Sequence, residues 1–142
     1  ILLKPGKLTK EEFDEMKVHT IIGAETLREV NRLHSGNDFV RTGIEIAESH
    51  HEKFDGTGYP HGLAGEEIPL VGRILALSDV YDALTSKRCY KEAFSHTRSH
   101  DIIVEGRGKH FDPNVVDAFV SSGKEFLGIR GRYVDAEHEV TS

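Results

Sequence analysis

The sequence predicts an all-α domain, a compact arrangement of about five to six helices, and three observations lead to this class. Apolar side chains recur every three or four residues along several segments, which is the spacing of one face of a helix. Helix-capping residues stand directly before most of these segments. Alternation of polar and apolar residues, the mark of half-buried strands, is missing. With 142 residues, the chain fits one domain that can bury a core.

The first helix is predicted from about Lys10, because Thr9 and Glu12 have the spacing of a capping box. Its apolar stripe continues to Leu33. Gly23 lies inside this stripe, and we expect it to loosen or bend the helix, since glycine is a poor helix former.

A second helix follows the break at residues 35–37, with Asp38 as its expected N-cap, and runs to about His51. Val40, Ile44, Ala47 and His51 fall on one face of it. His50 and His51 therefore stand in the last turn and lean toward the buried side.

A third helix is expected from Leu70 to about Ser86, and it is apolar nearly all round, which is typical of a buried helix. Asp79 lies within it. A buried carboxylate without a partner costs several kcal/mol, so we expect Asp79 to form a salt bridge or to coordinate a metal ion.

Two further helices are expected towards the C-terminus. Ser95 can cap one that ends near Gly106, and Asp112 with Pro113 can begin a last one that runs through about Ser121 and stops at Gly123. Residues 128–142 are polar and aperiodic, so we divide the chain into a domain at 1–127 and a C-terminal tail at 128–142.

Composition excludes several classes of protein. The net charge of −6 argues against nucleic-acid binding, which needs a basic face. No apolar run approaches the roughly 20 residues of a membrane span, and we expect no secretory leader. Cys89 is the one cysteine, so an internal disulfide is impossible and a reducing, cytoplasmic location is expected. The chain begins with Ile1 rather than Met, so we expect a fragment or a processed chain.

Residues 50–60, HHEKFDGTGYP, are the strongest candidate for a functional site. Two imidazoles, which are common ligands of divalent metals, run directly into a loop with two glycines. Pro60 restricts the backbone of Tyr59, so that loop presents an aromatic ring in a limited set of conformations. The alternatives are two surface histidines before an ordinary turn, or core histidines satisfied by hydrogen bonds.

This stretch resembles the signature of the HD-GYP family of metal-dependent phosphohydrolases. The resemblance includes His19 and extends from Leu3 to about Phe119 through these further segments: residues 3–9, 62–63, 68–69, 79–86, 88, 90–91 and 110–113. It implies hydrolysis of cyclic di-GMP to a linear dinucleotide in bacterial second-messenger signalling.

By this resemblance His19, His50, His51 and Asp79 are the metal ligands, and Asp79, His50 and His51 are also the catalytic residues. A mixed set of nitrogen and oxygen ligands suits iron, manganese, nickel or zinc better than magnesium or calcium. The intact site is expected to hold two or three divalent transition metal ions, with iron or manganese favoured.

The resemblance also assigns substrate-binding residues. Gly58 and Tyr59 belong to the loop, with the ring of Tyr59 stacked on a guanine. Arg88 and Lys91 would contact phosphate or base, a role that suits the planar fork of arginine. An ordinary solvated turn is the alternative for the basic residues 87–91.

The family's leading His-Asp pair is absent, so we expect the C-terminal portion of the domain, truncated at its N-terminus. Four protein ligands cannot fill two metal shells, which predicts poor turnover by the isolated chain. Two other functions stay open: a related phosphohydrolase acting on another nucleotide, and a degenerate module that binds a ligand or partner domain without turnover. The expected context is the output domain of a larger response regulator or sensor, with an upstream receiver or sensor domain or a diguanylate-cyclase-type partner domain.

Overall fold

The computed structural model describes residues 4, 6–86, 93–129 and 131. Within these residues the chain is helical and has no sheet, which confirms the all-α prediction. The elements in order are α1 (Lys10–Leu33), α2 (Asp38–Ser49), the 3₁₀ helix η1 (Gly65–Glu67), α3 (Leu70–Thr85), α4 (His96–Glu105) and α5 (Pro113–Ser121).

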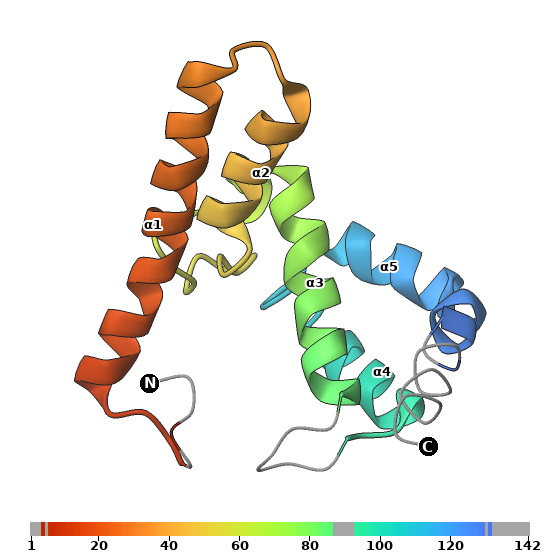
Figure 1. The fold of residues 1–142 in the computed structure, drawn as a ribbon. Coiled ribbons are helices and arrows are strands. Elements are labelled where there is room, and N and C mark those ends of the chain that lie inside the picture. Colours follow the sequence, from red (N-terminus) through yellow and green to blue (C-terminus); the bar gives the residue numbers. More distant parts are fainter. Residues whose placement is uncertain (1–3, 5, 87–92, 130, 132–142) are drawn as a thin grey trace, which may run out of the picture.

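The helices form two groups that meet along α3 (Figure 1). Helices α1 and α2 pack against each other as an antiparallel pair, and α2 also packs on α3. On its other side α3 contacts α4 and α5, which contact each other. Helix α1 is longer than α2, so its N-terminal part extends past the end of its partner.

The predicted capping box of α1 is confirmed. Thr9 Oγ1 accepts the Glu12 backbone N–H at 3.2 Å, and a Glu12 carboxylate oxygen accepts the Thr9 N–H at 2.7 Å. Helix α1 is not interrupted at Gly23 and is continuous to Leu33. Gly23 faces α2, where a Cβ would lie 3.7 Å from that of Ala47, and packing against this neighbour supports the helix there.

The N-cap of α2 is Asn37 rather than Asp38, a correction of one residue. The Asn37 side chain accepts the Phe39 N–H at 3.0 Å. Asp38 is the first helical residue, where its negative charge interacts favourably with the positive end of the helix dipole. At the other end α2 stops at Ser49, two residues before the predicted end, with His50 as its C-cap.

The caps of the last two helices are confirmed. Ser95 Oγ accepts the Arg98 N–H at 3.2 Å, and the Asp112 side chain accepts the Asn114 N–H at 2.7 Å with Pro113 at the start of α5. Helix α5 ends at Ser121, as predicted, but it is not the last helix, because residues 123–129 are helical again.

An apolar core lies among the last three helices. Its buried members are Leu77, Tyr81, Ile103, Phe111, Val116 and Phe119. Phe126, from the helical residues 123–129, packs on this core with its ring centroid 5.3 Å from that of Tyr81. This contact explains why the chain resumes a helix after Ser122.

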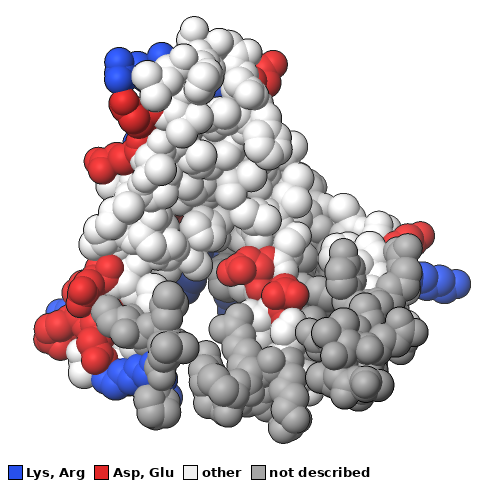
Figure 2. All heavy atoms as spheres, in the orientation of Figure 1, with Lys and Arg blue, Asp and Glu red and all other residues white. Residues whose placement is uncertain are grey.

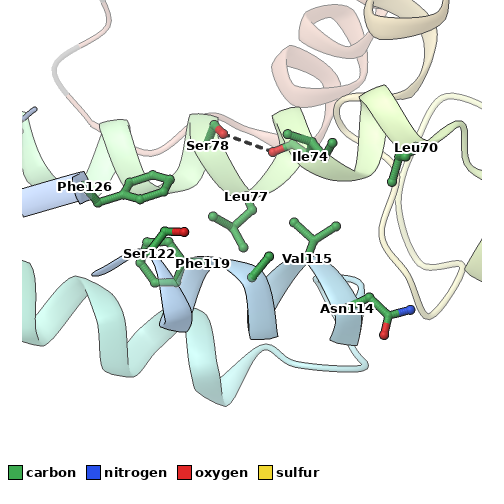
Figure 3. A pocket seen from close by; sticks show the side chains of 10 residues that line it. Leu70, Ile74, Leu77, Ser78, Asn114, Val115, Phe119, Ser122 and Phe126 are labelled. Carbon is green, nitrogen blue, oxygen red and sulfur yellow. Dashed lines mark hydrogen bonds between the residues drawn. The ribbon is translucent and has the colours of Figure 1, made fainter. Parts of the chain in front are cut away.

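The prediction that α3 is buried nearly all round is wrong for one strip of the helix. Leu70 and Ile74 are 55% and 46% exposed. They line an apolar groove of about 370 Å³ between α3 and α5, together with Val115 and Phe119 (Figure 3). Helices α2, α4 and α5 pack against α3 and leave this strip open.

Close backbone approach joins the two groups of helices. A Cβ added at Gly72 of α3 would lie 2.8 Å from the Cβ of Ser49 on α2, so glycine permits the helices to meet here. None of the helices in the described residues combines the length and hydrophobicity that crossing a membrane requires.

Candidate metal centre and substrate loop

Three imidazoles converge where α1 passes the end of α2. They belong to His19 of α1, His50 at the C-cap of α2 and the following His51, and one ligand nitrogen from each lies within 4.8 Å of the others. The ring centroids of His50 and His51 are 4.0 Å apart, and those of His19 and His51 are 5.0 Å apart. Such a group of nitrogen donors could hold a transition metal ion.

Backbone carbonyls set the tautomers of two of these histidines. His19 Nδ1 lies 2.6 Å from the Met16 carbonyl oxygen, and His50 Nδ1 lies 2.9 Å from that of Ile46. Because a carbonyl oxygen only accepts hydrogen bonds, each Nδ1 must carry the proton and donate it. In a neutral ring this places the lone pair on Nε2, and the hydrogen bond fixes the ring orientation, as outer partners of metal-binding histidines do.

The third imidazole is held in its neutral form. Burial, and secondly the nearby rings of His50 and His19, lower the pKa of His51 from 6.5 to about 4, although the charge of Asp79 acts in the opposite direction. At neutral pH His51 thus has no added proton. The neutral ring is the form that binds a metal.

Asp79 does not lie where the sequence predicts it, buried within α3. Its side chain is exposed rather than buried, and it is not part of the histidine group found among the described residues. Its charge nevertheless opposes the lowering of the His51 pKa and contributes to the raised pKa of Tyr59, so it faces the same region. Helix α3 meets α2 at Gly72, and seven further residues at 1.5 Å each carry Asp79 about 10 Å along the helix.

The space-filling view shows how this region is shaped (Figure 2). A hollow separates the N-terminal part of α1 from α3, and acidic side chains border it on the α3 side. Asp79 and Asp82 are exposed acidic residues of α3.

The ring of Tyr59 stacks directly on the histidine group. Its centroid lies 4.8 Å from that of His51 with 25° between the planes, and the Tyr59 N–H donates to the His51 carbonyl oxygen at 3.2 Å. The loop thus folds back on the end of α2. Burial, followed by the charge of Asp79, raises the pKa of Tyr59, which keeps the phenol neutral.

Gly58 allows this fold-back. A Cβ at residue 58 would lie 2.5 Å from Glu52 Cα and 2.6 Å from its carbonyl carbon, distances that no side chain tolerates against a backbone. The structure therefore gives Gly58 a packing role, and its predicted role in substrate binding stays a prediction.

Glu52 anchors the loop from its buried side, a role that was not predicted from the sequence. It is 1% exposed, and its carboxylate accepts backbone N–H groups of His61 at 2.7 Å, Gly62 at 3.1 Å and Leu63 at 3.1 Å. Three such bonds satisfy a buried carboxylate without a cation. A charged residue directly after the two histidines could have indicated a role near the site. Its partners are backbone N–H groups, however, and these cannot be recognised from residue types.

The predicted phosphate or base contacts Arg88 and Lys91 lie outside the described residues. Of the eight predicted site residues, the structure brings together His19, His50, His51, Gly58 and Tyr59, and it places Asp79 nearby.

The family assignment follows from comparison with known proteins. The HD domain family matches residues 1–115, and the chain belongs to it. A cyclic di-GMP phosphodiesterase of Vibrio cholerae serotype O1 is 55% identical over 136 residues, covering 96% of this chain and 28% of the relative. This likeness confirms the HD-GYP resemblance.

Two other relatives match nearly the same share of this chain at lower sequence identity. The cyclic di-GMP phosphodiesterase response regulator RpfG of Xanthomonas campestris is 46% identical, over 96% of this chain and 35% of that protein. A 3'3'-cGAMP-specific phosphodiesterase 2 of V. cholerae is 39% identical, over 95% of this chain and 25% of that protein. The chain thus spans about a quarter to a third of the length of these relatives.

A solved structure confirms the fold. The cyclic GMP-AMP-specific phosphodiesterase V-cGAP3 of V. cholerae superposes with a TM-score of 0.56 at 21% identity, covering 89% of this chain and 27% of that one.

Proposed function

We propose that the protein containing this chain is a metal-dependent phosphodiesterase that hydrolyses cyclic di-GMP to a linear dinucleotide. The observation that carries the proposal is the convergence of three imidazoles beside the stacked ring of Tyr59. Relatives named as cyclic di-GMP phosphodiesterases support it. Their names also favour turnover over the alternative of a module that only binds.

His19, His50 and His51 would hold the metal, and Asp79 would join them from α3 as an oxygen ligand. Iron or manganese suits this mixed set best, with nickel and zinc as further candidates and two or three ions in the intact site. When bound, such ions supply a hydroxide nucleophile at neutral pH and stabilise charge on the phosphoryl oxygens.

The loop residues bind and orient the dinucleotide. One face of the Tyr59 ring lies against His51, so a guanine can stack on the opposite face. Gly58 and Glu52 keep the ring in this position. Arg88 and Lys91 would bind the phosphates, a contact that Arg88 can make with two parallel hydrogen bonds.

The proposed setting is the cytoplasm, as the output domain of a response regulator or sensor. The name of the relative RpfG, a response regulator, supports an upstream receiver domain. A diguanylate-cyclase-type partner domain is part of the same proposal.

The test is turnover of cyclic di-GMP by the whole protein loaded with manganese or iron, with products separated by chromatography. His50→Ala should lower both bound metal and rate at least tenfold, because it removes one lone pair of the group.

Tyr59→Ala should weaken dinucleotide binding by about 1–3 kcal/mol, the usual worth of a base–aromatic stack. His34→Ala, an exposed histidine at the far end of α1, is the matched control. A metal-loaded wild type that binds cyclic di-GMP without hydrolysing it would contradict the proposal.

A further inference from the structure

One face of α1 reaches beyond α2 to the Tyr59 loop. Residues 13, 17, 20 and 24 follow the spacing of a single helix face. Thr20 and Ala24 on this face are buried where α1 packs on α2. Phe13 and Lys17 continue the face towards the N-terminus of α1, where α2 has already ended, and so they meet the loop instead.

Phe13 borders the ring of Tyr59. The two centroids are 5.9 Å apart at 83°, an edge-to-face contact, yet Phe13 remains 44% exposed. An exposed phenylalanine beside an exposed part of a second ring forms an apolar wall at right angles to that ring. A planar base that stacks on Tyr59 can rest its edge against such a wall.

Lys17 brings a cation to the same place. Its Nζ lies 4.9 Å from the Phe13 ring centroid and 5.8 Å from that of Tyr59. Asp14 holds the ammonium at 2.7 Å from one side. An ammonium has three N–H donors, so binding Asp14 leaves donors that can serve a ligand.

We propose that Lys17 is a base-reading residue that makes the substrate loop select guanine over adenine. The proposal rests on the proposed function and adds a determinant of its specificity. His51 stacks on one face of Tyr59, and the Lys17 ammonium lies over the same ring at 5.8 Å from its centroid. A base that stacks on the face left open by His51 displaces this ammonium, and the flexible lysine side chain then reaches the edge of the base. Guanine presents two acceptors there, O6 and N7, whereas adenine presents an amino donor beside N7. A lysine can donate to both guanine acceptors but meets a competing donor on adenine.

A purely electrostatic role for Lys17 predicts something different. An ammonium that only attracts the phosphates would strengthen binding of every cyclic dinucleotide by the same factor, since their backbones carry the same charge. Base reading instead changes the ratio between guanine and adenine ligands. That ratio is therefore the quantity to measure.

The experiment measures equilibrium binding of cyclic di-GMP and cyclic di-AMP by calorimetry to the whole protein treated with a chelator, so that turnover does not interfere. Lys17→Met keeps the length and helix propensity of the side chain but removes the charge and the donors. It should weaken cyclic di-GMP binding about tenfold or more and cyclic di-AMP binding less than about twofold. Lys17→Arg, which retains donors suited to O6 and N7, should keep the preference.

Lys124→Met is the matched control, because Lys124 is an exposed lysine outside the site whose loss changes the charge equally. It should leave both affinities unchanged. Equal weakening of both ligands by Lys17→Met, or no weakening of either, would overturn the proposal, as would a wild type that binds both equally or neither. A wild type that prefers guanine but does not hydrolyse cyclic di-GMP when loaded with metal would contradict the proposed function and leave the role of Lys17 supported.

Discussion

The two groups of helices differ in the apolar side chains that they bury. The site half, formed by α1, α2 and residues 50–64, buries the polar residues Thr20, Ser49 and Glu52. The core half, formed by α3, α4, α5 and residues 123–129, buries a cluster of aliphatic and aromatic residues together with the polar residues Ser99 and Asp112. Hydrogen bonds and close backbone contacts hold the first, whereas removal of apolar surface from water stabilises the second.

This difference separates stability from function in a small domain. The imidazoles that we propose as metal ligands must keep a lone pair available, so these side chains of the site half cannot be used for packing alone. The core half contains none of the proposed metal-binding histidines, so its side chains can be packed for stability alone. Substitutions in the two halves should therefore have different signatures.

The largest effect is expected in the core half. Ile103→Ala removes a side chain that is 0% exposed and should lower the free energy of unfolding by about 2–5 kcal/mol, because it loses burial and leaves a cavity. Urea denaturation measures this. Ile74→Ala removes the same atoms from a residue that is 46% exposed and should change stability by no more than about 0.5 kcal/mol. Equal effects of the two substitutions would contradict the placement of the core.

Gly58→Ala should act on the site half. The added methyl meets the backbone of Glu52, so the loop must move, at a cost of about 3 kcal/mol. Tyr59 then leaves His51, and dinucleotide affinity should fall while hydrogen exchange in α4 and α5 stays slow. Gly6→Ala is the control, because a Cβ there has no atom within 4 Å. Unchanged affinity would show that the fold-back of the loop is not needed for binding.

Glu52→Gln should have a somewhat smaller effect, about 1–3 kcal/mol. The new amide group brings donors to a place where three backbone N–H groups already need acceptors. Amide exchange at residues 61–63 should rise more than in the core half. Glu66→Gln, an exposed glutamate nearby, should leave both stability and exchange as they are. A variant as stable as the wild type, with unchanged exchange, would refute the role given to Glu52.

The smallest effect is a pH dependence of stability in the metal-free protein. The folded pKa of His51, about 4, lies below the ordinary 6.5, so the unfolded state binds more protons between these values. Stability should therefore be level above pH 6.5 for this residue and fall as the pH drops from 6.5 towards 4.

Urea midpoints at pH 7.5 and 5 measure this dependence, and His51→Gln should reduce the loss. The pKa of His110 is also lowered, by burial and by Lys53, and this histidine remains in the variant, so a smaller pH-dependent loss of stability should persist. The same loss with and without His51 would show that another group causes it.

Helix starts could be predicted from the sequence because capping depends on neighbours in the chain. Thr9, Ser95 and Asp112 cap their helices as expected, since each acts on N–H groups two or three residues away. Which face of a helix is buried was harder to predict from the sequence. The exposure of Ile74 and Asp79 depends on which other helices cover α3, and periodicity alone cannot tell this for a helix that is apolar on most sides.

The site shows the same division. The convergence of His19 with His50 and His51 could be anticipated from residue types and the family resemblance, and the structure brings the three together. The parts played by Glu52 and Gly58 could not, because both act on backbone atoms, which every residue has. Pairing with a backbone leaves no complementary residue in the sequence to find.

The contact between Gly72 and Ser49 has a consequence for how this protein can evolve. Alanine at position 72 would collide with the side chain at position 49, so that substitution is harmful while serine is present. If position 49 first becomes glycine, the space for the methyl group opens and the same substitution becomes acceptable. The order in which two mutations arise would thus decide whether a lineage could pass from one pair to the other.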